Sequence, residues 1–294
     1  PDLSEKSARF RYLFNRLCAT VERIMDEVSE ELKSSDFEPL AFELAFGADG
    51  QLPAITIREK NGTARVVGKV DRVDGWLHNG KLYLRVVDYK TGKKSFDLAE
   101  LRYGLGLQML LYLFTLKEEG RALFGGQEIV PAGVLYTPAR EPMLRCARDT
   151  APEKIEKARK KELRRSGMVL EDPAVLQAME HSALTSPCYL PIAVKKDGAV
   201  TGSLASAEQL GKLSKYVDRL LHEITQEVFA GNIDADPYAR TPQLSACTYC
   251  EFASACHFEN GCGSDRMEYI KATKNDEFWQ HIDEVNGKEA RSDG

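Results

Sequence analysis

An acidic and a basic side chain stand two residues apart at the end of an apolar segment, after a second acid. The pair is Asp88 and Lys90 in VVDYKTG, and the second acid is Asp71 in GKVDRVD. Because side chains alternate along a strand, Asp88 and Lys90 point to one face. Carboxylates on neighbouring strands can converge on Mg²⁺ or Mn²⁺, which would polarise a phosphate ester and lower the pKa of bound water. Lys90 could orient that water or stabilise charge on the phosphate.

The plainer interpretation of Asp-x-Lys at a strand end is a surface ion pair, and Asp71 is what favours the chemical one. Asp74 has the opposite parity to Asp71, so only one of them can face the same site on a regular strand. We therefore expect Asp71 to be the ligand and Asp74 to be structural, paired with Arg72 or Arg102.

Two polar side chains stand four residues apart in YGLGLQMLLY, with Gly104 about one turn before them. Gln108 and Tyr112 would share one face of a helix at this spacing. A small residue, an amide and a phenol suit the approach of a nucleic-acid backbone, although a helix edge with incidental polar residues fits the pattern too.

Four of the seven cysteines fall within a short stretch near the C-terminus. Cys247, Cys250 and Cys256 have the spacing C-x2-C-x5-C, and Cys262 follows. Such clustering favours a metal or iron–sulfur site in a reducing cytoplasm over a disulfide framework. A zinc site and three free buried cysteines are the alternatives. Cys146 and Cys188 are expected to be ordinary core or surface residues.

Hydrophobic periodicity predicts the elements that must position these residues. Helices are expected at 5–34, 97–118, 152–184 and 206–230, and strands at 40–46, 53–59, 64–77, 82–90 and 129–139. The first four strands would form a meander, 189–200 a peripheral hairpin, and the residues after the cysteines a polar tail. This order predicts an α/β fold with a mixed central sheet flanked by helices. The expected segments are a core at 1–138, a helical insertion at 139–205 and a C-terminal cysteine-rich segment at 206–294.

The bulk properties restrict the class of protein. The chain has 294 residues, 43% hydrophobic and 29% charged, with a net charge of −5. No secretory signal or membrane-spanning run is visible, and the missing initiator Met suggests a piece of a longer protein. The charge argues against a general basic coat but allows a local basic groove. The run KIEKARKKELRR is either a solvated helix face or a contact with DNA phosphates.

The three core motifs together are specific, and through them the chain resembles the RecB-like branch of the PD-(D/E)XK nucleases. The similarity extends through PAGVLYTPA and CTYCEFASACHF and is closest to the AddB-type nuclease domains. It implies that Asp71 and Asp88 bind Mg²⁺ or Mn²⁺, that Lys90 is the catalytic lysine, and that Gln108 and Tyr112 form the Q-x3-Y motif. Glu43 is a possible match to a further acid. Many relatives have an upstream metal-associated His, and Glu22 replaces it here or the position is empty.

The resemblance also has implications for the cysteines and the partners. It implies that Cys247, Cys250 and Cys256 are three ligands of a [4Fe–4S] cluster, with their sulfurs close together and a fourth ligand upstream. Cys18 is an N-terminal candidate for it, and Cys262 or His257 could substitute locally. An AddA-like helicase–nuclease subunit and a DNA end would be the partners in the cytoplasm. No P-loop motif is present, so this chain is not the ATP motor. The alternatives are a free-standing, CRISPR-associated type of RecB-like nuclease and a non-catalytic iron–sulfur module that binds DNA.

Overall fold

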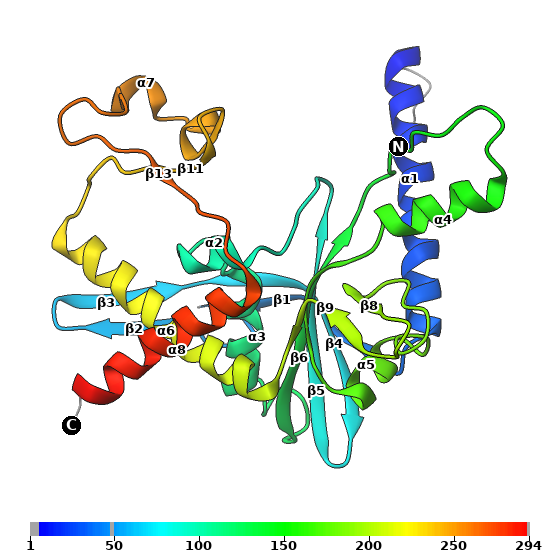
Figure 1. Ribbon diagram of the computed structural model, residues 1–294, viewed down its shortest axis with the longest axis horizontal. Coiled ribbons are helices and arrows are strands. Elements are labelled where there is room, and N and C mark those ends of the chain that lie inside the picture. The colour runs from blue at the N-terminus through cyan, green and yellow to red at the C-terminus, as the bar shows by residue number, and fades with distance from the viewer. Residues whose placement is uncertain (1–5, 48–49, 293–294) are drawn as a thin grey trace. The chain divides into compact units, whose positions relative to one another are not determined.

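The computed structural model describes residues 6–47 and 50–292, which form two compact units (Figure 1). The first, here called the sheet unit, comprises residues 1–54, 67–96 and 109–210. The second, called the cysteine unit, comprises residues 55–66, 97–108 and 211–294. The chain therefore crosses between the two units several times.

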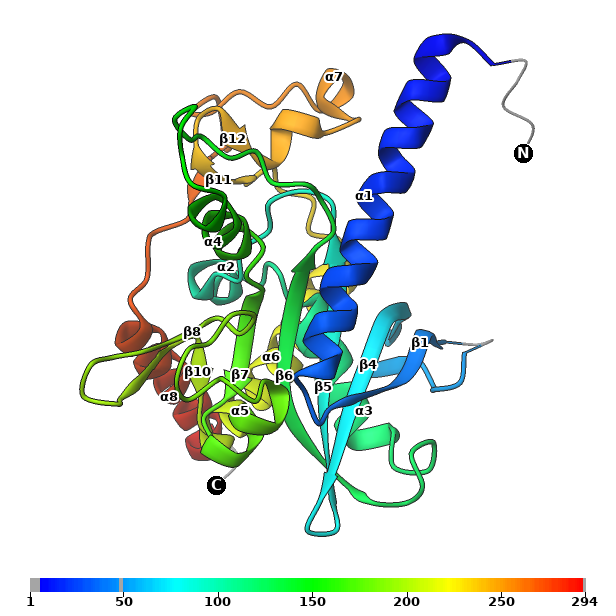
Figure 2. The same cartoon turned by 90° about the vertical axis from the view of Figure 1, so that its right-hand side faces the viewer.

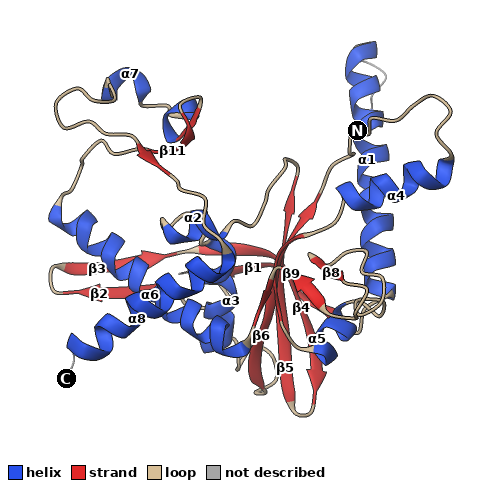
Figure 3. Ribbon diagram, in the orientation of Figure 1, coloured by secondary structure: helices blue, strands red, loops and turns tan. Residues whose placement is uncertain are grey.

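The sheet unit is built on a six-stranded mixed sheet (Figure 3). Its strands in spatial order are β1 (Glu38–Phe46), β4 (Gly68–His78), β5 (Lys81–Lys90), β6 (Glu128–Pro138), β7 (Ser166–Leu170) and β10 (Leu204–Ala205). The pairs β5–β6 and β7–β10 are parallel and the other three are antiparallel. On the central strand β5, Leu84, Val86 and Val87 are fully buried, as expected for a strand covered on both faces.

Helices cover both faces of this sheet. The long α1 (Ala8–Lys33) lies against one face and α3 (Gln108–Glu119) against the other (Figure 2). The remaining elements of the unit are α4 (Pro152–Glu162), α5 (Pro173–Met179) and the hairpin β8 (Ile192–Val194) and β9 (Val200–Gly202). Helix α1 begins where the Ser7 hydroxyl accepts a hydrogen bond from the Phe10 amide at 3.2 Å. The α/β fold with a mixed central sheet is thus confirmed.

A two-residue turn sets the register of the central hairpin. Asn79 and Gly80 join β4 to β5, and their φ angles of 51° and 75° are those of a type I′ turn. The first pair of the ladder is His78 with Lys81, and the pairing runs without interruption to Arg72 with Val87. Which side chains of β4 and β5 share a face therefore follows from this turn.

A buried ionic cluster joins α1 to the sheet. The Asp74 carboxylate accepts hydrogen bonds from Arg72 at 3.0 Å and from Arg85 at 2.8 Å. Glu31 of α1 accepts one from Arg165 Nε at 3.1 Å and lies 3.6 Å from Arg85. Burial alone would raise the pKa of the Glu31 carboxyl, but the nearby guanidinium groups together hold that pKa below its ordinary value. The carboxylates therefore remain charged inside the fold.

The cysteine unit combines a hairpin, three helices and a small sheet. Its elements are β2 (Ile55–Glu59), β3 (Gly62–Val66), α2 (Leu98–Arg102), the larger part of α6 (Ala207–Ala230), β11 (Tyr238–Thr241), β12 (Leu244–Ser245), η1 (Ala246–Tyr249), α7 (Ala253–Cys256), β13 (Glu268–Tyr269) and α8 (Asn275–Ser292). Phe278 and Ile282 of α8 are fully buried. No helix among the described residues is long and apolar enough to cross a membrane.

Two predicted strands and one predicted helix differ from the structure because the chain breaks inside them. The expected strand at 64–77 divides into β3 and β4 around the exposed Val67. β2 and β3 pair only with each other, so β1 pairs directly with β4 and the four-strand meander was wrong. The expected helix at 97–118 divides into α2 and α3, because Gly104 and Gly106 adopt φ angles of 72° and 70°.

Two further predictions missed elements. The expected helix at 152–184 contains β7, whose residues SGMVL are too short a run to show a period. The segment 139–205 thus contributes β7 and β10 to the central sheet. The expected polar tail contains β13 and α8, whose buried Phe278, Trp279 and Ile282 stand at helical spacing.

We expect Glu31→Gln to lower the free energy of unfolding by about 3–5 kcal/mol, because it leaves the buried Arg165 and Arg85 without their counter-ion. The folded-state pKa of Glu31 is lowered, so its contribution is present above the unfolded value of about 4.3 and is lost as the pH falls through the folded value. The difference between wild type and variant, measured by urea denaturation, should therefore shrink in acid. Glu30→Gln is the matched control, since Glu30 is exposed. Equal effects of the two variants would contradict the assignment.

Candidate active site

Glu43 and Asp71 stand opposite each other on β1 and β4. Glu43 lies between Phe42 and Leu44, whose partners in β4 are the immediate neighbours of Asp71. Glu43 itself has a φ of 50°, in the left-handed region, which marks an irregular point in the strand. The Glu43 carboxylate forms an ion pair with Lys69, and its side chain is mostly exposed.

Asp71 and Asp88 stand opposite each other on β4 and β5. The ladder between these strands ends at Arg72 and Val87, and one further step of the same register sets Asp71 beside Asp88. The Asp71 carboxylate accepts a hydrogen bond from the Tyr89 amide at 3.0 Å, which holds it at the end of the ladder. Glu43, Asp71 and Asp88 thus occupy neighbouring positions on three adjacent strands.

Asp88 and Lys90 are neighbours on one face of β5, as their spacing predicted. Lys90 Nζ lies 2.7 Å from Asp88 Oδ2 and 5.9 Å from the centre of the Tyr136 ring on β6. Burial raises the pKa of the Asp88 carboxyl above its ordinary range; Lys90 opposes this rise and Asp71 adds to it. The Asp88 side chain is 8% exposed and that of Lys90 is 35% exposed, so solvent reaches the site from the lysine side.

Asp74 does not belong to this group. Its carboxylate oxygens contact Arg72 and Arg85 on the face of the sheet that carries Glu31 of α1. The structural role predicted for Asp74 and its pairing with Arg72 are confirmed, whereas the second partner is Arg85 and not Arg102. Parity along the strand distinguished Asp71 from Asp74 correctly.

The carboxylates are present, but their side chains are turned to protein partners. Among residues 6–47 and 50–292, no three His, Cys, Asp or Glu side chains are grouped so as to hold a metal ion. Asp88 contacts Lys90, Asp71 accepts from the Tyr89 amide, and Glu43 contacts Lys69. The donor set nevertheless suits a hard divalent cation, because the buried Asp88 stands beside a second carboxylate and its raised pKa shows uncompensated negative charge. Glu22 is exposed on α1 and has no contact with this row in the described structure.

Gln108 and Tyr112 fall on α3 as expected, but they have different surroundings. Gln108 is the first residue of the helix and is exposed, whereas Tyr112 is 7% exposed. The Tyr112 ring meets Phe46 edge to face, with the ring centres 5.1 Å apart. Gly104, expected on the same helix face, lies outside α3. Tyr112 is thus part of the packing beneath β1 and β4.

The three spaced cysteines lie in short elements of the cysteine unit. Cys247 belongs to η1, Cys250 follows it, and Cys256 is the last residue of α7. The Cys250 amide donates to the Cys247 carbonyl at 3.3 Å. The expectation that their sulfurs lie ready to share one centre is not met in the described structure, and His257 and Cys262 do not complete such a group. Thiolates repel one another, so such a group is stable only with its metal bound.

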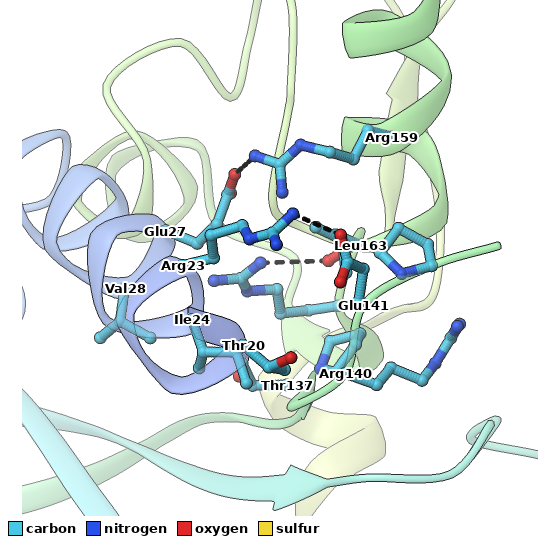
Figure 4. A pocket seen from close by; sticks show the side chains of 13 residues that line it. Thr20, Arg23, Ile24, Glu27, Val28, Thr137, Arg140, Glu141, Arg159 and Leu163 are labelled. Atoms are coloured by element: carbon cyan, nitrogen blue, oxygen red, sulfur yellow. Dashed lines mark hydrogen bonds and ion pairs between the residues drawn. The ribbon is translucent and has the colours of Figure 1, made fainter. Parts of the chain in front are cut away.

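The cavity beneath α1 is not a second candidate site. It has a volume of about 20 Å³, and Thr137, which lines it, lies on the sheet face opposite to Tyr136 and Lys90. Its charged side chains are paired with one another: Figure 4 shows Arg159 directed at Glu27 and Arg23 at Glu141. These ion pairs join α1 to α4 and to the loop after β6.

Comparison with known proteins identifies the family to which this arrangement belongs. Residues 1–257 match the PD-(D/E)XK nuclease superfamily. The chain belongs to this superfamily. The match confirms the fold and the resemblance inferred from GKVDRVD and VVDYKTG. Superfamily membership also explains why a carboxylate pair and a lysine meet at the end of a central hairpin.

Individual relatives share one description, each being named as the B-type subunit of an ATP-dependent helicase/deoxyribonuclease. The protein from Ruminiclostridium cellulolyticum is 33% identical over 286 residues, which cover 96% of this chain and 25% of the relative. That from Acetivibrio thermocellus is 36% identical over 276 residues, or 93% of this chain and 24% of the relative. A relative from Clostridium botulinum is 33% identical over 287 residues, or 96% of this chain and 25% of the relative. The chain spans about a quarter of the length of these curated relatives.

Lys69 is a site residue that the sequence interpretation missed. Its hydrogen bond to Glu43 raises the pKa of the Lys69 ammonium, and the Asp71 carboxylate adds to the rise. Lys69 stands two residues before Asp71 on β4, so strand alternation could have placed it on the same face. The signal was present, but its partner Glu43 depends on the pairing of β1, which the sequence did not reveal.

Gly68 is the residue that lets Tyr112 pack below the acidic row. A Cβ atom there would lie 2.8 Å from Phe46 Cζ and 2.9 Å from Tyr112 Cε1. We expect Gly68→Ala to lower the free energy of unfolding by about 1–3 kcal/mol through overpacking. The loss should be smaller in a Tyr112→Leu background, where the ring is absent. A double-mutant cycle by urea denaturation measures this coupling.

Gly92→Ala is the matched control, because a Cβ at Gly92 would meet nothing within 4 Å. Equal costs for Gly68→Ala with and without the Tyr112 ring would show that this contact does not limit the packing.

Proposed function

We propose that this chain is a metal-dependent deoxyribonuclease that hydrolyses phosphodiester bonds at the row formed by Asp71 and Asp88 together with Lys90. The observation that carries the proposal is the register of β4 and β5, which sets the two carboxylates opposite each other with Lys90 on the same face. Membership of the PD-(D/E)XK nuclease superfamily supports the reaction class.

Each residue of the row has a role that follows from its position. Asp71 and Asp88 would hold Mg²⁺ or Mn²⁺, with Glu43 as a further ligand on the neighbouring strand. The bound cation would supply charge neutralisation at the phosphate and a lowered pKa for water. Lys90 would place its ammonium beside the scissile phosphate, where it stabilises developing negative charge or orients the water. Its partial exposure leaves it accessible to a substrate.

Residues at the start of α3 would position the substrate. Gln108 is exposed at the first turn of the helix, where its amide can meet a nucleic-acid backbone. Tyr112 supports that turn from below through its contact with Phe46. Gln108 would therefore affect binding more than the chemical step.

The relatives support a larger context for this activity. Because they are named as one component of an ATP-dependent helicase/deoxyribonuclease, we infer that the chain is the nuclease part of an AddB-like protein in the cytoplasm. An AddA-like helicase–nuclease subunit would be its partner and a DNA end its substrate, in recombinational repair. The match over most of the chain favours this context over a free-standing CRISPR-associated nuclease.

We expect Asp88→Ala and Lys90→Ala each to reduce DNA cleavage by at least about 10²–10³-fold, since each removes charge from the reacting centre. Cleavage of end-labelled single- and double-stranded DNA with Mg²⁺ is the measurement. Lys81→Ala is the matched control, because Lys81 stands at the other end of β5 in an exposed ion pair with Glu128.

Circular dichroism and thermal melting should show that the variants are folded. Cleavage at the wild-type rate by either folded variant would overturn the assignment of the site. Cleavage that persists in EDTA would overturn the metal dependence instead.

The cysteine segment would hold an incomplete cluster in this chain. A [4Fe–4S] cluster needs four thiolates or equivalent ligands, and the described residues do not group even three. The cluster does not fit the described arrangement, and no step of the reaction is assigned to it. The spacing of Cys247, Cys250 and Cys256 supports three potential ligands, with the alternative that they hold zinc.

We expect the chain, purified without oxygen, to contain well below four iron atoms per molecule by iron and sulfide analysis. Cys250→Ser should lower whatever iron or zinc is bound, whereas Cys146→Ser should not. Four iron atoms and four sulfides per wild-type chain would show that all ligands are present and would contradict the prediction.

A further inference from the structure

A hollow of about 390 Å³ adjoins Lys90 on the sheet face that carries Asp88. Six of the twelve residues that line it are basic and one, Glu162, is acidic. The basic residues are Lys90, Lys93, Lys94, Arg140, Lys161 and Arg164. This local excess of positive charge stands in a chain whose net charge is −5. It therefore marks a surface suited to a polyanion.

A second hollow of about 550 Å³ continues the first along α4. The two share Lys93, Lys161 and Glu162, and the second adds Arg145 and Lys154. Apolar side chains of Met143, Leu144 and Ile155 lie among these charges. The lining of the two hollows, here called the basic track, thus extends from Lys90 along one side of α4.

The walls of the basic track near Lys90 are held in place by hydrogen bonds. The Phe96 amide donates to the Ser166 hydroxyl at 2.7 Å, which ties the end of the loop after β5 to the start of β7. Arg164 donates to the carbonyls of Ile192 at 3.2 Å and Pro187 at 2.6 Å. The loop lysines Lys93 and Lys94, by contrast, are exposed. A rigid floor with exposed cationic side chains suits a flexible charged chain.

Glu162 is the internal anion of the track. Its carboxylate lies 3.6 Å from Lys93 Nζ and 3.9 Å from Arg140, which are loose contacts shared between two cations. A phosphate group could take the same cations with better geometry. Removing the Glu162 charge should therefore favour binding of a polyanion.

We propose that the basic track binds the sugar-phosphate backbone of the nucleic-acid strand on one side of the bond to be cut. This inference rests on the proposed function, because Lys90 is where the track meets the reacting centre. Phosphates would contact Lys93, Lys94 and Lys161, and sugars or bases would meet the apolar side chains between them. Continuity over two hollows fits a chain with repeated charges better than a single small anion.

The test uses the full chain with Asp88→Ala, in EDTA, so that binding is measured without cleavage. The probe is a fluorescein-labelled single-stranded oligonucleotide, followed by anisotropy over a range of salt concentrations. Lys93→Gln/Lys94→Gln should weaken binding and make the plot of log K against log salt shallower by about 1.4, since each phosphate contact on a single strand contributes about 0.7. Between about 50 and 200 mM salt, the parent should lose about sevenfold more affinity than the variant.

The matched control is Lys195→Gln/Lys196→Gln, an exposed pair of neighbouring lysines on the β8–β9 hairpin. It changes the net charge equally and should leave the salt slope unchanged. Glu162→Gln should bind the oligonucleotide more tightly than the parent. With the nuclease-competent chain, Lys93→Gln/Lys94→Gln should raise KM and leave kcat nearly unchanged.

Several outcomes would overturn the proposal. Equal losses from the two lysine pairs would show a general charge effect, and an unchanged slope would show that Lys93 and Lys94 touch no phosphate. Equal competition by polyglutamate would identify an acidic polypeptide as an equally good occupant. Because binding is read without metal or cleavage, failure here differs from failure of the proposed function, which would appear as normal binding without cutting.

Discussion

The two-residue turn between β4 and β5 is the constraint on which the site depends. With Asn79 and Gly80 as the only residues of the turn, the pairing of the two strands is determined along their length. A shift of one residue would move Asp88 away from Asp71 and exchange the two faces of the strand. The same shift would bring the wrong parity of β5 against the ionic cluster of Glu31, which therefore also opposes it. Turn chemistry and buried charge select one register together.

Much of the site could be predicted because it depends on local geometry. Alternation along β5 gave the shared face of Asp88 and Lys90, and parity along β4 separated Asp71 from Asp74. Glu43 was harder to interpret, because its place opposite Asp71 arises from pairing between β1 and β4 across the β2–β3 hairpin. Long-range pairing leaves no periodic signal in the sequence. The ion pair of Glu43 with Lys69 was missed for the same reason.

The fold was predictable in class but less so in its element boundaries. The apolar run of β6 and the long period of α1 were clear, whereas β7 was hidden because five residues are too few to show a period. The break between α2 and α3 results from backbone angles at Gly104 and Gly106 that helical periodicity does not register. The cysteine spacing correctly marked a distinct segment. The arrangement of its sulfurs depends on a metal and on ligands that spacing alone does not reveal.

The repeated crossing of the chain between its two units has a consequence for how such a protein can be divided. Residues 55–66 lead directly into the strand of Asp71, and residues 97–108 connect the strand of Lys90 to α3. Within the cysteine unit, Phe229 of α6 packs against Gly62 of the hairpin. A truncation before residue 211 would thus uncover segments that remain covalently attached to both sides of the carboxylate row. The two units are therefore interlaced along the chain, and recombination or engineering at a single junction cannot transfer one without the other.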